Sequence, residues 1–222
     1  MSYFLFLSIL LFLFWFLFLF LSHTTRKEQL IMSLAGLILS PAILLVSLGS
    51  VQVAGGSVVG IGIEDFLFSF SFFGIAAVIY QAILGKHMKP WKGKKSIFIH
   101  PVAHWFLHLI IVLAVWIILS LSFVILLSLS SPHAFAMGGL LIGTYVIAHR
   151  HDLFFNAIIS GVMVMILLFV LEQIFFFRLS GGEAAVTETI LSSVSTEELV
   201  WSWVVGFAIG PLYEYLRHQK LV

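Results

Sequence analysis

Two pairs of adjacent carboxylic acids stand out in a chain that has few charges. Glu64–Asp65 opens the run IEDFLFSFSFFGIAAVIYQ, and Glu197–Glu198 opens the run TEELVWSWVVGFAIGPLYE, 133 residues further on. Laying one run over the other matches each acid with an acid and a late tyrosine with a tyrosine. Such residues are scarce in this sequence, so their repeated spacing indicates an internal repeat.

At helical spacing each acid stands over a stripe of aromatic side chains. A carboxylic acid held away from water is a proton donor, and aromatic faces stabilise a developing carbocation. This combination suits an unsaturated isoprenoid, which is itself soluble in the membrane. The candidate catalytic residues are Glu64, Glu197, Asp65 and Glu198, and the candidate substrate-binding residues are Phe68, Trp201, Tyr80, Tyr213, Ser202, Phe70 and Trp203.

A purely structural role for the same residues stays open. Acids in the first turn of a helix complement the helix dipole, and Ser195 with Glu198 has the spacing of a capping box. Aromatic stripes also pack in cores or face lipid. The recurrence favours function over capping alone, because Gly62 offers the first acidic pair no side-chain cap.

Histidines indicate a second, less favoured chemistry. His100 and His104 are four residues apart, which places two imidazoles on one helical face, as a pair of metal ligands requires. His149 and His151 would complete such a set in a metal-dependent membrane enzyme. The chain has no cysteine and no adjacent histidines, so we predict no metal and no other cofactor.

The elements that carry these residues must be membrane helices. The 222 residues are 61% apolar and 9% charged, whereas soluble domains are about 25% charged. A formal net charge of +1 excludes a general basic surface for nucleic acid. Pro211 is expected to kink the last helix. Apolar runs of about 20 residues predict seven spans, near 3–22, 29–51, 63–84, 101–128, 134–148, 153–177 and 198–216.

Lysine and arginine predict the orientation, because basic loops stay cytoplasmic. With the N-terminus outside and the C-terminus cytoplasmic, every basic residue except Arg178 falls on the cytoplasmic side. Spans three and seven then run in the same direction, so the repeats are parallel.

We expect one all-α, polytopic membrane domain with about seven transmembrane helices. It would consist of a three-helix repeat in 1–84, a basic loop and linking helix in 85–130, and a second repeat in 131–222. A pseudo-twofold axis along the membrane normal would bring both acidic pairs toward one cavity.

The duplicated unit, with IEDFLF and TEELVW opening its last helix, resembles the flavin-independent lycopene cyclase family. The family signature is Pro-x-Glu-Glu-like, and Gly62 and Ser195 stand at its proline positions. The resemblance implies an isomerase-type enzyme that closes the end rings of lycopene by proton addition and loss, with Glu64 and Glu197 leading and Asp65 and Glu198 supporting or replacing them. It also implies no cofactor, and as partners the membrane lipids and an apolar isoprenoid such as lycopene. The alternatives are a non-catalytic isoprenoid- or lipid-binding membrane protein or a small transporter.

Overall fold

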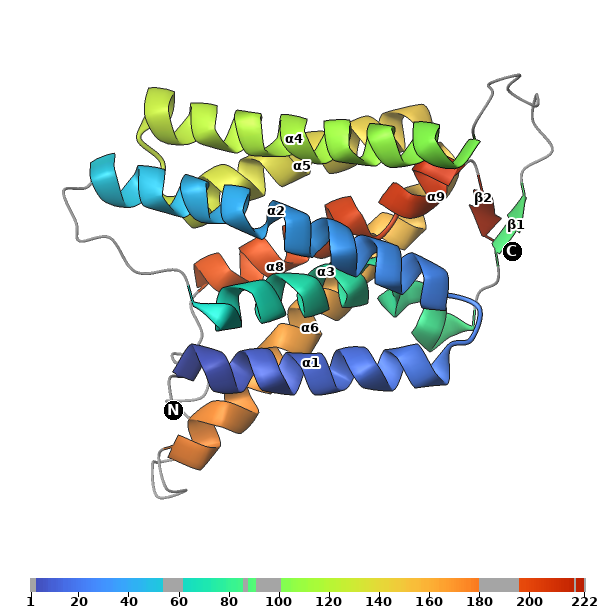
Figure 1. The fold of residues 1–222 in the computed structure, drawn as a ribbon, viewed down its shortest axis with the longest axis horizontal. Coiled ribbons are helices and arrows are strands. Elements are labelled where there is room, and N and C mark those ends of the chain that lie inside the picture. Colours follow the sequence, from blue (N-terminus) through green and yellow to red (C-terminus); the bar gives the residue numbers. More distant parts are fainter. Residues whose placement is uncertain are drawn as a thin grey trace.

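A computed structural model describes residues 3–53, 62–85, 88–90, 101–179, 196–217 and 219–221. The described chain forms a bundle of long α-helices (Figure 1). In chain order the elements are α1 (Tyr3–Leu21), α2 (Arg26–Val53), α3 (Ile63–Leu84), β1 (Met88–Pro90), α4 (Pro101–Leu127), α5 (Ser131–His149), the 3-10 turn η1 (His151–Leu153), α6 (Phe154–Leu179), α8 (Thr196–Ile209), α9 (Leu212–Arg217) and β2 (Gln219–Leu221).

Within the described residues, six stretches are helical, long and apolar enough to cross a membrane. α2 has 28 residues and packs in the same bundle, chiefly against α3. Large apolar side chains face outward, among them Leu126 at 78% exposed and Phe155 at 70%, which suits lipid rather than water. The predicted fold class, an all-α polytopic membrane protein, is confirmed. The six stretches are Phe4–Leu21, Ile63–Leu84, Trp105–Leu127, Ser131–His149, His151–Ile174 and Thr196–Arg217.

The helices run up and down, so the bundle has two chemically different ends. We call the end that holds Arg26, Arg150 and Arg217 the basic end, and the end where α3 and α8 begin with their acidic pairs the acidic end. The N-terminus lies at the acidic end and the C-terminus at the basic end (Figure 1).

The last long apolar helical stretch is interrupted about two thirds of the way along, toward the basic end. α8 ends at Ile209 and α9 begins at Leu212, with Gly210 and Pro211 in a turn between them. Proline has no N–H to donate and its ring clashes with the preceding turn. The predicted kink at Pro211 is confirmed.

α3 and α8 occupy corresponding places in the two halves of the bundle. α3 packs on α2 and α1, and α8 packs in the same order of extent on α6 and α5 (Figure 1). α1 and α5 begin 128 residues apart, as do α2 and α6, while α3 and α8 begin 133 residues apart. α4 lies outside this pattern and bridges α2 and α5.

Residues that are 133 positions apart touch one another at several levels of the bundle. The rings of Phe68 and Trp201 stack with centroids 6.1 Å apart, and Gln81 donates a hydrogen bond to Glu214 at 2.6 Å. A side chain close to a twofold axis meets its own counterpart. These contacts therefore locate a pseudo-twofold axis between α3 and α8.

A short antiparallel ribbon was not foreseen from the sequence. β1 pairs with β2, with Met88 opposite Leu221, again 133 positions apart. Three residues per strand carry too little alternation to be recognised as strands. The ribbon joins the segments that follow α3 and α9, so it ties the two halves together at the basic end.

Glycine allows the close approach of helices within the second half. A Cβ added at Gly206 would lie 2.6 Å from the carbonyl oxygen of Ser160 and 2.8 Å from the Cα of Gly161. Both atoms belong to the backbone of α6, so they cannot move aside as a side chain would. α8 and α6 therefore touch backbone to backbone, as small residues at a membrane-helix interface permit.

Candidate functional site

A cavity of about 450 Å³ opens at the acidic end, between the two halves of the bundle. Its wall is built by α1, α2, α3, α5 and α8. That volume falls within the ordinary range of ligand pockets, roughly 300–1,000 Å³. The lining includes Asp65, Phe68, Ser69, Phe135, Glu198 and Trp201.

The two halves contribute matched residues to this cavity. Asp65 and Glu198 are 133 positions apart, and so are Phe68 and Trp201. The cavity therefore straddles the pseudo-twofold axis. Two carboxylic acids and a pair of aromatic rings face one apolar space, the combination that proton-initiated chemistry requires.

One of the two lining acids also caps its helix. The Asp65 carboxylate accepts a hydrogen bond of 2.8 Å from the backbone N–H of Gly62. That N–H precedes α3, so the contact is the carboxylate half of a capping box. Capping and cavity lining are combined in a single side chain, and the structural role that the sequence left open for Asp65 is present.

The first acids of each pair are placed differently. Glu64 and Glu197 are not among the residues that line the cavity. The Glu197 carboxylate lies 3.8 Å from the ring of His133, and both side chains are about half exposed. The backbone carbonyl of Glu64 accepts a hydrogen bond from the Ser8 hydroxyl at 3.1 Å, which fastens the start of α3 to α1.

An aromatic wall runs from the cavity into the core. Trp201 stacks almost parallel on Phe72, at 5.0 Å and 7°, and its ring lies 6.3 Å from that of Phe135. Phe135 in turn stacks on Trp116 at 4.7 Å. Because Phe72 and Trp116 are buried, Trp201 is held in a fixed position at the mouth of this wall.

The other predicted substrate-binding residues near this level lie outside the cavity. Phe70 packs on Trp15 at 4.9 Å, and Trp203 stacks on Phe207 at 5.1 Å. Ser202 is buried and its hydroxyl donates to the backbone carbonyl of Leu199 at 2.9 Å. Neighbouring positions on a helix point about 100° apart, so Phe70, two positions from Phe68, and Ser202 and Trp203, one and two positions from Trp201, are turned away from the cavity.

Tyr80 and Tyr213 lie at the opposite end of the bundle. Each is twelve positions along the helix from its cavity aromatic, a separation of about 18 Å. Tyr213 is buried, its hydroxyl accepts a hydrogen bond from Arg217 at 2.7 Å, and its ring meets Trp105 edge-on at 5.8 Å. The structure therefore does not bring the two tyrosines together with the acidic pairs.

The histidines considered as metal ligands are dispersed or undescribed. His100 lies outside the described residues, as does the side chain of His104. His149 is exposed, with its Nδ1 3.1 Å from the backbone carbonyl of Tyr145, and His151 is also exposed. Among the described residues, no group of three or more His, Cys, Asp or Glu is placed to hold a metal ion.

A second polar cluster lies buried at the basic end. Gln81 donates to Glu214 at 2.6 Å and, in a longer contact of 3.4 Å, to Glu28. Asn156 donates to the same Glu214 oxygen at 2.9 Å and its own oxygen accepts from Ser160 at 2.9 Å. All five side chains are at least nine-tenths buried.

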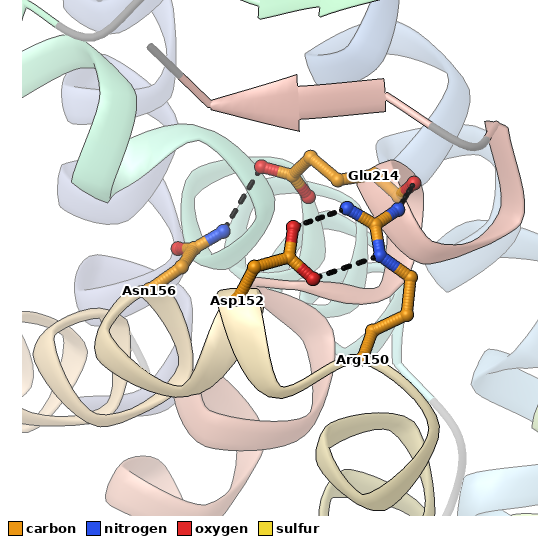
Figure 2. Close-up of polar contacts among 4 residues, drawn as sticks. All are labelled: Arg150, Asp152, Asn156 and Glu214. Carbon is orange, nitrogen blue, oxygen red and sulfur yellow. Dashed lines mark hydrogen bonds and ion pairs between the residues drawn. The ribbon is translucent and has the colours of Figure 1, made fainter. Parts of the chain in front are cut away.

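Arg150 holds this cluster in place from the turn between α5 and α6. Its guanidinium donates to both carboxylate oxygens of Asp152, at 3.1 and 2.6 Å, and to the backbone carbonyl of Glu214 at 3.0 Å (Figure 2). Figure 2 shows Asn156 reaching the Glu214 carboxylate from the other side. The arginine thus fixes α9, just beyond the break at Pro211, against α6.

Sequence reasoning did not identify this cluster as a site. The signal present was the match of Gln81 with Glu214 inside the repeat. Polar residues inside membrane helices are costly and mark functional positions by default. The same rule points to Asn156, but it does not say which polar residues meet, so the contacts of Glu28 and Asn156 with this pair come from the structure.

No protein-family model matches the chain, and neither the curated proteins nor the solved structures contain a match. Support for a function therefore comes from the side chains of the chain itself.

Proposed function

We propose that this protein is a membrane enzyme that cyclises the end group of a carotenoid or related isoprenoid, in the cavity at the acidic end. The observation that carries the proposal is the pair Asp65 and Glu198, which face one cavity from matched positions beside the rings of Phe68 and Trp201. The resemblance of IEDFLF and TEELVW to the lycopene cyclase motifs supports the same chemistry.

The reaction needs an acid, an acceptor for the returned proton and an apolar surface. A carboxylic acid adds its proton to the terminal alkene, and the electron pair of a second alkene closes the ring onto the resulting cation. A proton then leaves a carbon beside the new cationic centre, which forms the ring alkene and returns the proton to a carboxylate. Atoms and electrons balance without an oxidant or a cofactor.

We assign the donor role to Glu198 because the Asp65 carboxylate is already engaged by the Gly62 amide. Asp65, the other acid that lines the cavity, then receives the proton that leaves. The rings of Trp201 and Phe68, which line the cavity side by side, stabilise the cation through their negative faces and keep water away from it. Phe72 supports both rings from behind.

The distribution of lysine and arginine predicts the orientation of the protein in the membrane. We propose that the basic end is cytoplasmic, because lysine and arginine are retained on that side. The N-terminus and the cavity at the acidic end then lie on the outer side. An apolar substrate would enter from the bilayer, since the cavity opens between membrane helices.

Pigment analysis in a lycopene-producing host tests the proposal. Expression of the chain is expected to convert lycopene into ring-containing products, and Glu198→Gln and Asp65→Asn are expected to abolish the conversion. Asn at position 65 still offers an oxygen to cap α3. Glu64→Gln and Glu197→Gln are the matched controls, which we expect to retain activity because neither residue lines the cavity.

Two results would overturn the assignment. Unchanged lycopene, with the parent protein folded in the membrane, rules out the cyclase function. Activity that survives in both cavity variants but is lost in Glu64→Gln or Glu197→Gln returns the catalytic role to the first acid of each pair.

A second candidate function is non-catalytic binding of an isoprenoid or lipid end group in the same cavity. The placement of Glu64 and Glu197 outside the lining, together with the capping role of Asp65, favours it. This function predicts that purified protein carries unreacted polyene, and that Trp201→Ala removes it. The two candidates separate on whether the pigment recovered is cyclised.

A further inference from the structure

The buried cluster at the basic end contains more acceptor oxygens than donors. Oε2 of Glu28, Oε1 of Gln81 and Oε2 of Glu214 are buried and have no hydrogen-bond partner among the described residues. All three belong to side chains joined through the Gln81 amide nitrogen. Unpaired buried acceptors cost free energy, so this group is built to meet something positively charged.

Two further buried oxygens lie at the start of α2. Oγ1 of Thr25, in the turn just before the helix, and Oε1 of Gln29 have no partner in the described chain. The Gln29 amide nitrogen donates to the backbone carbonyl of Trp15 at 2.7 Å, so this side chain is turned toward α1. Carboxylate, amide and hydroxyl oxygens without any nitrogen or sulfur ligand are the donor set of a hard cation.

The local charges leave one negative charge to be balanced. Asp152 accepts two hydrogen bonds from Arg150, so these two charges compensate each other. Arg26 is turned to the backbone carbonyl of Leu19, and Arg217 lies beside the cluster, held by the Tyr213 hydroxyl. The positive charge of Arg217, added to the two negative charges of Glu28 and Glu214, leaves a net charge of minus one.

We propose that the oxygens of Glu28, Gln81 and Glu214 bind one alkali-metal cation, on the pseudo-twofold axis at the basic end. A divalent ion would leave the cluster with a net positive charge, and magnesium gives up its own water shell reluctantly. A proton engages only one donor and one acceptor oxygen, which leaves the remaining acceptors unpaired. A monovalent metal ion balances the charge and satisfies several oxygens together.

Sodium binding to the purified full chain in detergent tests the proposal directly. Equilibrium dialysis with radioactive sodium is expected to give saturable binding of one ion per chain. Replacing choline chloride by sodium chloride at constant ionic strength should raise the midpoint of thermal unfolding. We expect a rise of roughly 3–6 °C at ten times the dissociation constant. Potassium chloride, run in parallel, ranks the two ions.

Glu28→Gln and Glu214→Gln are expected to remove both the binding and the shift, because each replaces one carboxylate by a neutral amide of the same shape. Glu172→Gln is the matched control: it removes another buried acid of a membrane helix, away from the cluster, and should keep both. Dialysis of the parent protein needs no variant, so the test stands even if one variant does not fold.

Three results would overturn the proposal. The first is the absence of saturable sodium or potassium binding to the folded parent. The second is binding that persists unchanged in both cluster variants. The third is a midpoint that rises on acidification and ignores alkali ions, which would assign the positive charge to protons. The cation site does not depend on the cyclase function, since no step of that reaction uses it.

Discussion

Gly206→Ala tests whether backbone contact between α6 and α8 holds the second half of the bundle together. The added Cβ would lie 2.6 Å from the Ser160 carbonyl oxygen, whereas ordinary contact begins at 3.4 Å, so the helices must separate by about 0.8 Å. A gap of that size removes roughly a quarter to a half of the dispersion energy of each atom contact. For some 40 atom contacts of ~0.15 kcal/mol each, the lost dispersion energy is about 1.5–3 kcal/mol.

Helix propensity opposes this loss. Alanine is favoured over glycine in a helix interior by about 1 kcal/mol. The net expectation is therefore a protein less stable by roughly 0.5–2 kcal/mol, so a loss of stability indicates that packing outweighs propensity. Titration of purified protein with sodium dodecyl sulfate, followed by tryptophan fluorescence, measures the free energy of unfolding.

Gly62→Ala is the matched control for this substitution. Its Cβ would meet the end of the Glu64 side chain, which can turn away. We expect a change within about 0.5 kcal/mol. A Gly206→Ala protein as stable as its parent, or more stable, would refute the close approach of α6 and α8. Equal losses in both variants would show that the method is reporting glycine content and not this interface.

Two further hydrogen-bonded pairs give predictions of the same kind. Arg150→Met should destabilise the protein by roughly 2–3 kcal/mol, since it removes the ion pair and two hydrogen bonds that the partly buried Asp152 receives from Arg150. In a double-mutant cycle with Asp152→Asn the two losses should be far from additive, and additivity would contradict the ion pair. Trp15→Phe should cost about 1–2 kcal/mol through loss of the buried 2.7 Å hydrogen bond to Ser33. The Ser33→Ala change should cost little more once Trp15 is replaced, and a full second loss would count against the bond.

The helices could be predicted almost completely from the sequence. Apolar runs bounded by charged or turn residues placed α1, α3 and α4 within one residue of their observed ends. That works because the bilayer demands about 20 apolar residues per span and internal satisfaction of every backbone group. The break at Pro211 was predicted for a similar reason, because proline lacks the N–H that would continue the helical hydrogen bonds.

The rotation of each helix was harder to predict. In an apolar chain, the residues that face lipid and those that face the core are chemically alike, so periodicity does not separate them. For that reason the sequence did not distinguish Asp65 and Glu198, which line the cavity, from Glu64 and Glu197, which do not. Which side of a helix faces its neighbour is decided by packing of the whole bundle.

The stripe pattern did not show how far apart its residues lie along the bundle. Phe68 and Tyr80 share a helix face, as do Trp201 and Tyr213, and for that reason all four were predicted to belong to one site. The membrane thickness separates them, because a straight helix carries twelve residues across about 18 Å. A shared face is thus a weaker indication of a shared site in a membrane helix than in a short soluble one.

The acids and amides at the basic end follow from the twofold relation itself. A side chain on a twofold axis meets its own copy, so two identical copies of the second half would set Glu214 against Glu214, where like charges repel in a dry site. Here Gln81 meets Glu214. Glu28 and Asn156 are also counterparts, because α2 and α6 begin 128 residues apart. The second copy therefore exchanges acid for amide on one helix and amide for acid on the other.

Every buried acid of the cluster gains an amide donor as a result. Glu28 accepts from Gln81, and Glu214 accepts from Gln81 and Asn156. A dimer of two identical second halves cannot supply that pairing at the axis, so it is the divergence between the two halves that gives the buried Glu214 an amide donor from across the axis.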